Sequence, residues 1–143
     1  MNTYQLGPVQ TDQDIHACFE VMRALRPHLA DAEAFAARVR RQAAQGYRLL
    51  AAWQREQAVA LAGYRVTENL LYGRFLYIDD LVASEAARGR GIGGDLVDEL
   101  RAEGRRQGCA YLVLDTALAN ALGQRFYYRQ GLLARGMHFS QPL

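Results

Sequence analysis

The chain has 143 residues, a formal net charge of +2, and hydrophobic side chains at half of its positions. This length predicts a single domain over residues 1–143 that folds without disulfides or a structural metal, and the small net charge argues against binding nucleic acid by neutralising its phosphates. No apolar run is long enough for a membrane span, and the scattered histidines and cysteines predict no metal site. The first residues do not resemble a signal peptide. We therefore expect a cytoplasmic protein that binds neither a membrane nor a metal.

The N-terminal part of the chain predicts one strand followed by two helices. Tyr4 to Val9 has the pattern of a short strand. Apolar residues at helical spacing then predict a helix that begins at Thr11 or Asp12 and is ended by Pro27. A second, alanine-rich helix is expected from about Asp31 to Gln45.

The remainder predicts four strands, a further strand at the end, and two helices. Short polar links between the first three strands are typical of an antiparallel meander. The expected order is β-α-α-β-β-β-α-β-α-β, which predicts an α/β or α+β domain with a mixed sheet and helices on both faces. The strands are expected at Tyr47 to Gln54, Ala58 to Thr67, Arg74 to Val82, Tyr111 to Leu114 and Ala134 to Phe139, and the helices at about Ile92 to Gly108 and Asn120 to Gln130.

The stretch from Arg88 to Gly94, RGRGIGG, contains four glycines between a predicted strand and a predicted helix. Glycine accepts positive φ and leaves no Cβ between the backbone and a ligand. Successive N–H groups can therefore turn toward one anion, and the N-terminus of the helix adds its dipole. Arg88 and Arg90 are placed to add charged contacts at the rim. We expect a site for a diphosphate here.

The same stretch also fits the dinucleotide pattern GxGxxG at Gly89, Gly91 and Gly94, with Asp115 about 20 residues further on. In a dinucleotide-binding fold the strand runs almost directly into the first glycine, whereas here residues 83–88 intervene. Only 28 residues follow Asp115, too few for the additional βαβ units of that fold. A nicotinamide dinucleotide site is therefore not expected.

Two motifs in the sequence resemble those of the GNAT N-acetyltransferases. The first, Arg/Gln-x-x-Gly-x-Gly/Ala after a strand with a hydrophobic end, is present at Arg88, Gly91 and Gly93. The second, Asn-x-x-x-x-x-Phe-Tyr-x-x-x-Gly, is present at Asn120, Phe126, Tyr127 and Gly131. The chain departs from the family at Gly123, where alanine is usual, and at Leu132, where phenylalanine is common. The expected order of elements matches the family's fold along the whole chain.

The resemblance implies that the acetyl group of acetyl-CoA is transferred to an amine by direct attack in a ternary complex. It assigns the pantetheine arm to the backbone of the strand end, the pyrophosphate to the glycine-rich loop, a cofactor contact to Asn120, and protonation of the departing thiolate to Tyr127. The strand end is Leu81, Val82 and Ala83, and the loop is Arg88, Gly89, Arg90, Gly91, Ile92, Gly93 and Gly94. A main-chain N–H near Val82 or Ala83 would stabilise the oxyanion.

The consecutive acids Asp79 and Asp80 are candidates for the base. Side chains alternate along a strand, so only one acid would face the cleft unless a bulge intervenes. In polyamine acetyltransferases, which this stretch resembles, an acid at the position of Asp79 takes the amine's proton through water. The alternatives are that both acids form salt bridges with arginines, or only bind a cationic substrate. Tyr127 likewise has an alternative role in packing its helix.

The acceptor amine is not defined by the sequence. The family often shapes its acceptor site with the segment between the first two helices, here about Leu25 to Phe35, and His28, Trp53 and Tyr72 are further candidates to line it. A catalytically silent acyl-CoA-binding regulatory module is the alternative function, and Tyr127 and Asp79 favour the enzyme, because a pure binder needs neither. A homodimer is compatible with the sequence.

Overall fold

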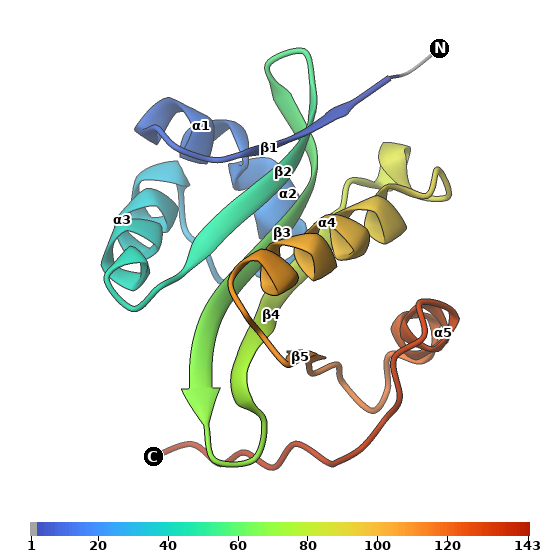
Figure 1. The fold of residues 1–143 in the computed structure, drawn as a ribbon. Helices are drawn as coiled ribbons and strands as arrows, with labels where there is room; N and C mark the ends of the chain where they lie inside the picture. Colours follow the sequence, from blue (N-terminus) through green and yellow to red (C-terminus); the bar gives the residue numbers. More distant parts are fainter. Residues whose placement is uncertain (1–2) are drawn as a thin grey trace. The chain divides into compact units, whose positions relative to one another are not determined.

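The computed structural model describes residues 3–143, and the chain forms two compact units, Met1–Val113 and Leu114–Leu143 (Figure 1). The first unit contains the sheet and four α-helices, and the second contains the last helix and the C-terminal segment.

The sheet has five strands in the order β1-β2-β3-β4-β5. The first four are antiparallel neighbours. A helix joins β4 to β5, the kind of crossover that connects parallel strands, so the sheet is mixed, as expected. The strands are β1 (Gln5–Pro8), β2 (Arg48–Gln54), β3 (Gln57–Asn69), β4 (Gly73–Ala83) and β5 (Tyr111–Leu114).

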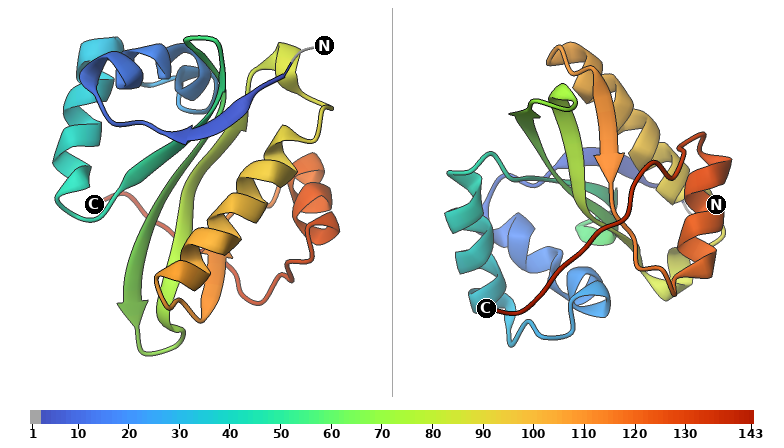
Figure 2. Two further views of the ribbon diagram at one scale, coloured as in Figure 1. Left: turned by 45° about the horizontal axis from the view of Figure 1, so that its top comes forward. Right: turned by 90° about the horizontal axis from the view of Figure 1, so that it is seen from below.

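Helices cover both faces of the sheet, which confirms the predicted fold class. Helices α1 (Asp12–Ala17), α2 (Phe19–Leu25) and α3 (Ala32–Ala43) lie on one face, and α4 (Ile92–Arg106) lies on the other (Figure 2). The helix predicted from residue 11 or 12 to Pro27 is instead two helices. They meet at Cys18, whose N–H bonds to the carbonyl of Ile15 three residues earlier, a tight turn that the apolar spacing does not reveal.

Local sequence explains where these helices begin. Thr11 and Asp14 form a capping box at α1, with Asp14 N–H donating to Thr11 Oγ1 at 3.1 Å and Thr11 N–H donating to Asp14 Oδ2 at 3.1 Å. Asp31 caps α3 by accepting from Ala34 N–H at 2.8 Å. The caps fix the first turns of α1 and α3.

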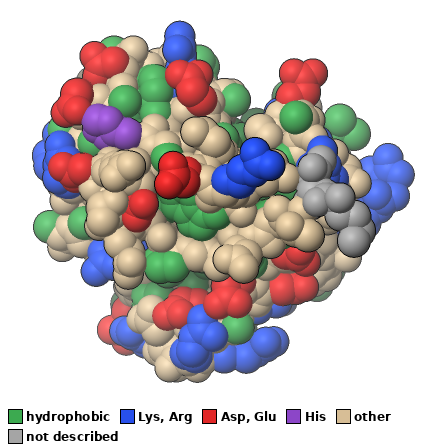
Figure 3. Space-filling view, turned by 90° about the horizontal axis from the view of Figure 1, so that it is seen from above, with side chains coloured by type: hydrophobic (Ala, Val, Ile, Leu, Met, Phe, Trp, Pro, Cys, Tyr) green, Lys and Arg blue, Asp and Glu red, His purple; other side chains and the backbone are tan. Residues whose placement is uncertain are grey.

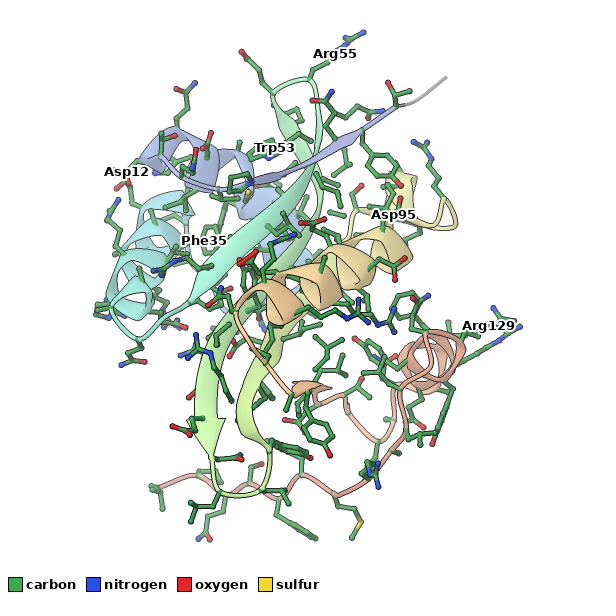
Figure 4. The ribbon with its side chains drawn as sticks, in the orientation of Figure 1. Asp12, Phe35, Trp53, Arg55, Asp95 and Arg129 are labelled. Carbon is green, nitrogen blue, oxygen red and sulfur yellow. The ribbon has the colours of Figure 1, made fainter. Side chains whose placement is uncertain are left out.

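A hydrophobic layer lies on each side of the sheet. On the α1–α3 side, the rings of Phe19 and Phe35 lie 6.1 Å apart, and Phe35 points from α3 toward the sheet (Figure 4). On the other side, α4 buries one apolar stripe, consisting of Ile92, Leu96, Val97 and Leu100. These two layers hold β3 and β4 in the middle of the first unit.

The second unit contains helix α5 (Ala121–Arg129) and an extended segment after it. The strand predicted over Ala134–Phe139 is wrong, because none of the described residues 132–143 belongs to a strand. A strand needs a partner for its backbone groups, and here residues 133–143 are all exposed, with Leu133, Met137 and Phe139 largely open to solvent. The apolar side chains of this alternating pattern are therefore not buried.

Candidate active site

A β-bulge in β4 lies at the two acids. Gly63 of β3 pairs with Asp80, whereas the next residue, Tyr64, pairs with Ile78, so Asp79 is the extra residue. Both Asp79 and Asp80 therefore border the same pocket instead of alternating between faces. Because of the bulge, both acids face the pocket.

This pocket, which we call the Asp79 pocket, has a volume of about 290 Å³ and lies between α2, α3 and β4. Met22, Leu29, Phe35 and Val39 form its apolar wall, and Arg26, Arg38, Asp79 and Asp80 are its charged residues. The segment from Leu25 to Phe35 thus contributes to the pocket, as does His28.

Trp53 and Tyr72, the two other residues suggested for an acceptor site, are not among the residues that line this pocket. Trp53 donates from Nε1 to the carbonyl of Gly7 at 3.2 Å, which ties β2 to β1. The ring of Tyr72 lies 5.3 Å from that of Phe75 and 5.0 Å from that of Tyr111. Both residues therefore pack within the first unit.

Asp80 is held at both carboxylate oxygens. Arg26 Nε donates to Oδ1 at 2.9 Å, and the Tyr47 hydroxyl donates to Oδ2 at 2.7 Å. Arg26 Nη2 also donates to the carbonyl of Asp79 at 2.9 Å. Arg26 therefore binds the side chain of one acid and the main chain of the other, which stabilises the bulge. Burial, followed by the nearby charge of Asp80, raises the pKa of Tyr47, so this phenol remains a donor.

Asp79 is held at one oxygen only. Arg65 Nε donates to its Oδ2 at 3.0 Å, and Arg65 Nη2 donates to Gln42 Oε1 at 3.0 Å. None of the residues that the structure describes donates to Asp79 Oδ1. Partial burial raises the pKa of the Asp79 carboxyl above its ordinary value, and Arg65 opposes this shift. The salt bridges considered from the sequence are thus present, but one oxygen of Asp79 remains available.

Gly63 makes this network possible, although the sequence analysis did not single it out. A Cβ at this position would lie 2.0 Å from the Tyr47 hydroxyl and 2.6 Å from Asp80 Oδ2. Only a residue without a side chain leaves room for the two groups to meet. A glycine inside a strand pattern is the signal that marks such a close approach or a bulge.

The glycine-rich loop follows β4 through a short 3₁₀ turn, η1 (Glu85–Ala87), and leads into α4. Gly89 and Gly91 both have left-handed φ, +80° and +79°, and a Cβ at either would meet nothing within 4 Å. Gly91 is the N-cap of α4 and provides no side-chain cap, so the N–H groups of the first turn, which includes Gly93 and Gly94, lack side-chain partners. Open backbone at a helix N-terminus has the geometry of an anion site.

The residues around this loop are consistent with an open surface. Ile92 is buried and anchors the start of α4, whereas the side chains of Arg88 and Arg90 are exposed. Asp95 lies on the first turn of α4 and accepts a hydrogen bond from the Tyr4 hydroxyl (Figure 4). On the face drawn in Figure 3, acidic and basic side chains are interspersed.

The end of β4 has strand pairing on one edge. Leu81, Val82 and Ala83 pair with β3. On the other edge, β5 begins beside Arg74, whose carbonyl accepts from Ala110 N–H at 2.8 Å, and β5 is only four residues long. In parallel register it therefore ends several residues short of Leu81. Within the described chain, this edge of residues 81–83 has no strand partner.

In the second unit, Asn120 caps helix α5. Its Oδ1 accepts from Gly123 N–H at 3.0 Å, and its Nδ2 donates to Thr116 Oγ1 at 3.0 Å. A Cβ on residue 123 would lie 2.3 Å from Asn120 Nδ2, so glycine in place of the family's usual alanine permits this side-chain position.

Tyr127 lies on the same helix, with its ring 5.3 Å from that of Phe126. Burial raises the pKa of Tyr127 above that of a free phenol, whereas Tyr128 is 56% exposed. No described residue forms a hydrogen bond with the Tyr127 hydroxyl. Tyr127 therefore remains protonated at neutral pH without being committed to a partner.

Across residues 3–143, no three His, Cys, Asp or Glu side chains are grouped so that they could hold a metal ion. None of the helices in the described part of the chain has the length and apolar character needed to span a membrane.

Comparison with known proteins identifies the family. The model for the "Acetyltransferase (GNAT) family" matches residues 12–132, and no curated protein sequence matches the chain. A putative acetyltransferase from Agrobacterium tumefaciens has 24% identity and a TM-score of 0.83, with 97% of this chain and 99% of that chain covered. Glucosamine-6-phosphate N-acetyltransferase from Arabidopsis thaliana has 18% identity and a TM-score of 0.79, with 98% of each chain covered.

An aminoglycoside N-acetyltransferase solved in complex with CoA has 14% identity and a TM-score of 0.82, with 98% of this chain and 97% of that chain covered. At such identities the structural likeness establishes the fold, and the family match spans most of the chain. The chain belongs to the GNAT acetyltransferase family.

Proposed function

We propose that the chain is an N-acetyltransferase that moves the acetyl group of acetyl-CoA to a primary amine by direct attack in a ternary complex. The observation that carries this proposal is the combination, on one strand and the loop after it, of an unpaired backbone edge and an open anion site. A family match and the CoA-bound structural neighbour support it.

The cofactor would bind along the end of β4 and at the start of α4. The unpaired edge of Leu81, Val82 and Ala83 would hydrogen-bond the pantetheine arm as an added strand. The pyrophosphate would bind at the loop from Arg88 to Gly94, where N–H groups and the helix dipole favour negative charge. Asn120 would use its second amide hydrogen, because the first already bonds to Thr116.

The Asp79 pocket would receive the acceptor. The amine would lose its proton toward Asp79 Oδ1, directly or through water, and its nitrogen would then attack the thioester carbonyl. A main-chain N–H near Val82 or Ala83 would stabilise the oxyanion, which is typically worth about 3 kcal/mol. As the C–S bond breaks, the hydroxyl of Tyr127 would protonate the departing thiolate of CoA.

A silent acyl-CoA-binding module is the second candidate. The available oxygen of Asp79 and the uncommitted hydroxyl of Tyr127 favour the enzyme, because a binding module needs neither group poised in this way. Release of CoA that depends on an added amine would separate the two functions.

Calorimetric titration with acetyl-CoA, with NADH as a negative control, tests the cofactor site. The informative variants are Gly91→Ala and its matched control Gly108→Ala. These glycines have similar φ values, +79° and +73°, and neither has a neighbour that a Cβ would touch, so both variants carry the same backbone strain. Only Gly91 lies in the loop.

We expect Gly91→Ala to weaken acetyl-CoA binding by about tenfold. The left-handed conformation costs alanine roughly 1–2 kcal/mol, so the backbone of the loop should shift and displace the N–H groups. Gly108→Ala should bind acetyl-CoA like the unaltered protein. Equal weakening by both variants would remove the loop from the cofactor site. Absence of acetyl-CoA binding by the unaltered protein would overturn the proposed function.

A further inference from the structure

We infer that the acceptor is an amine that also carries an anionic group, a carboxylate or a phosphate, and that Arg38 binds this group in the Asp79 pocket. This inference rests on the proposed function, because it concerns the acceptor side of the same site. It narrows the acceptor, which the sequence does not define, to amines that carry both charges.

The negative charge of both acids is already balanced by arginines. Arg26 forms an ion pair with Asp80 at 2.9 Å, and Arg65 forms one with Asp79 at 3.0 Å. The carboxylate of Asp80 is 12% exposed and that of Asp79 is 25% exposed, so solvent screens these pairs only partly. A polyamine would thus meet two carboxylates that each have a guanidinium beside them.

One cation of the pocket has no partner among residues 3–143. Arg38 is an exposed residue of α3 that lines the pocket, and no hydrogen bond or ion pair joins it to any residue that the structure describes. Its neighbour Arg40, on the same helix, pairs with Asp12 at 2.6 Å. Arg65 does not line the pocket but pairs with Asp79, and Arg26 pairs with Asp80, so the two carboxylates are balanced and the charge of Arg38 is left uncompensated. A guanidinium is well suited to a carboxylate or a phosphate.

The rest of the pocket is small and apolar. Its wall is formed by the apolar residues Met22, Leu29, Phe35 and Val39. The volume of about 290 Å³ lies just below the usual range of roughly 300–1,000 Å³ for small-molecule sites. The pocket therefore fits a small amine with an apolar portion.

The two charged ends of such an acceptor would be bound by different walls. Asp79, with one oxygen available, lies on β4, and Arg38 lies on α3. The amine would be bound toward Asp79 and the anionic group toward Arg38. This arrangement assigns deprotonation to one wall and substrate selection to the other.

The test compares matched pairs of amines at saturating acetyl-CoA, with release of the CoA thiol as the readout. L-Leucine and L-leucinamide differ in the carboxylate, O-phosphoethanolamine and ethanolamine differ in the phosphate, and spermidine serves as the polycation. The variants are Arg38→Gln and the matched control Arg41→Gln. Arg41 lies on the same helix and is exposed, but it does not line the pocket.

We expect at least one anionic amine to be preferred over its partner in kcat/KM. Arg38→Gln should reduce that preference by about tenfold, mainly through a higher KM, because it removes one charge-assisted contact. Arg41→Gln should leave it unchanged. Comparing the preference of the variant with that of the unaltered protein cancels the different basicities of the two amines in a pair. The pair whose preference falls in Arg38→Gln shows whether Arg38 binds a carboxylate or a phosphate.

The inference would be overturned by an unchanged preference in Arg38→Gln, or by better use of leucinamide, ethanolamine or spermidine than of the anionic amines. In both cases acetyl transfer, and with it the proposed function, would stand. Binding of acetyl-CoA without acetylation of any of the five amines would also overturn it. Failure to bind acetyl-CoA would instead remove the proposed function, and the inference with it.

Discussion

Replacing Gly63 with alanine would place a methyl group inside the hydrogen-bond network of the Asp79 pocket. The new Cβ would lie 2.0 Å from the hydroxyl oxygen of Tyr47, 2.7 Å from its Cζ and 2.6 Å from Asp80 Oδ2. Neither neighbour can move freely, because Tyr47 is 4% exposed and the Asp80 carboxylate is also held by Arg26. The hydrogen bond of 2.7 Å between Tyr47 and Asp80 must therefore break or the strands must shift.

The expected loss of stability follows from two opposing contributions. A hydrogen bond to a charged group is worth about 1.5–3 kcal/mol, and overpacking a filled site costs about 1–3 kcal/mol. The smaller freedom of alanine in the unfolded chain returns about 0.4–1 kcal/mol. Gly63→Ala should therefore lower the free energy of unfolding by about 2–5 kcal/mol, which at about 4 °C per kcal/mol for this chain length lowers the Tm by roughly 8–20 °C.

Thermal and urea unfolding followed by circular dichroism would measure this loss. Gly7→Ala is the matched control, because its Cβ would make an ordinary contact of 3.4 Å with Trp53, and it should stay within about 0.5 kcal/mol of the unaltered protein. Tyr47→Phe combined with Gly63→Ala should cost less than the sum of the single variants, since the hydroxyl that clashes is gone. Additive losses, or a Gly63→Ala variant as stable as the control, would refute the reasoning.

Three further predictions concern the reaction and the thiols. Tyr127→Phe should lower kcat by about 100-fold or more, as expected for loss of a general acid, while the calorimetric Kd for acetyl-CoA stays the same; an unchanged kcat would exclude Tyr127 as the acid. Burial raises the pKa of Cys18 to about 12. An aromatic disulfide reagent at pH 8 should therefore modify Cys109 in the folded protein and Cys18 only after unfolding. Rapid modification of both thiols in the folded protein would contradict this. Asp79→Asn should reduce kcat/KM with a small change in Tm, whereas Asp80→Asn should mainly reduce the Tm; the opposite pattern would reassign the two acids.

The elements that the sequence predicted well are those set by local signals. The strand Tyr111–Leu114 and the start of α4 after the glycine-rich loop are marked by an apolar run and by glycines with the required φ. The strand expected at Ala134–Phe139 failed for the opposite reason. Its alternation of side chains is local, but a strand also needs a partner with unpaired backbone groups, and no pattern within a segment supplies one.

The bulge at Asp79 could not be predicted from either strand alone. It depends on the register between β3 and β4, which shifts between Gly63 and Tyr64. Without that register, alternation places Asp79 and Asp80 on opposite faces. The local signal for this arrangement is Gly63, a glycine in the middle of a long strand pattern. Such a glycine indicates that other groups come close to the strand, but it does not show which groups these are.

The charge of the pocket depends on residues that lie far from the two acids in the sequence. Two consecutive acids, read locally, indicate a negative site, but Arg26 is separated from Asp80 by 54 positions and Arg65 from Asp79 by 14. The fold brings these arginines onto the acids, and Arg38 then leaves a positive excess. The oxygen of Asp79 that remains available can still take a proton, because basicity depends on one atom and its immediate surroundings. Selection of the substrate depends on the summed charge of the whole pocket, so with the role proposed for Arg38 the arginines, rather than the acids, would select the amine.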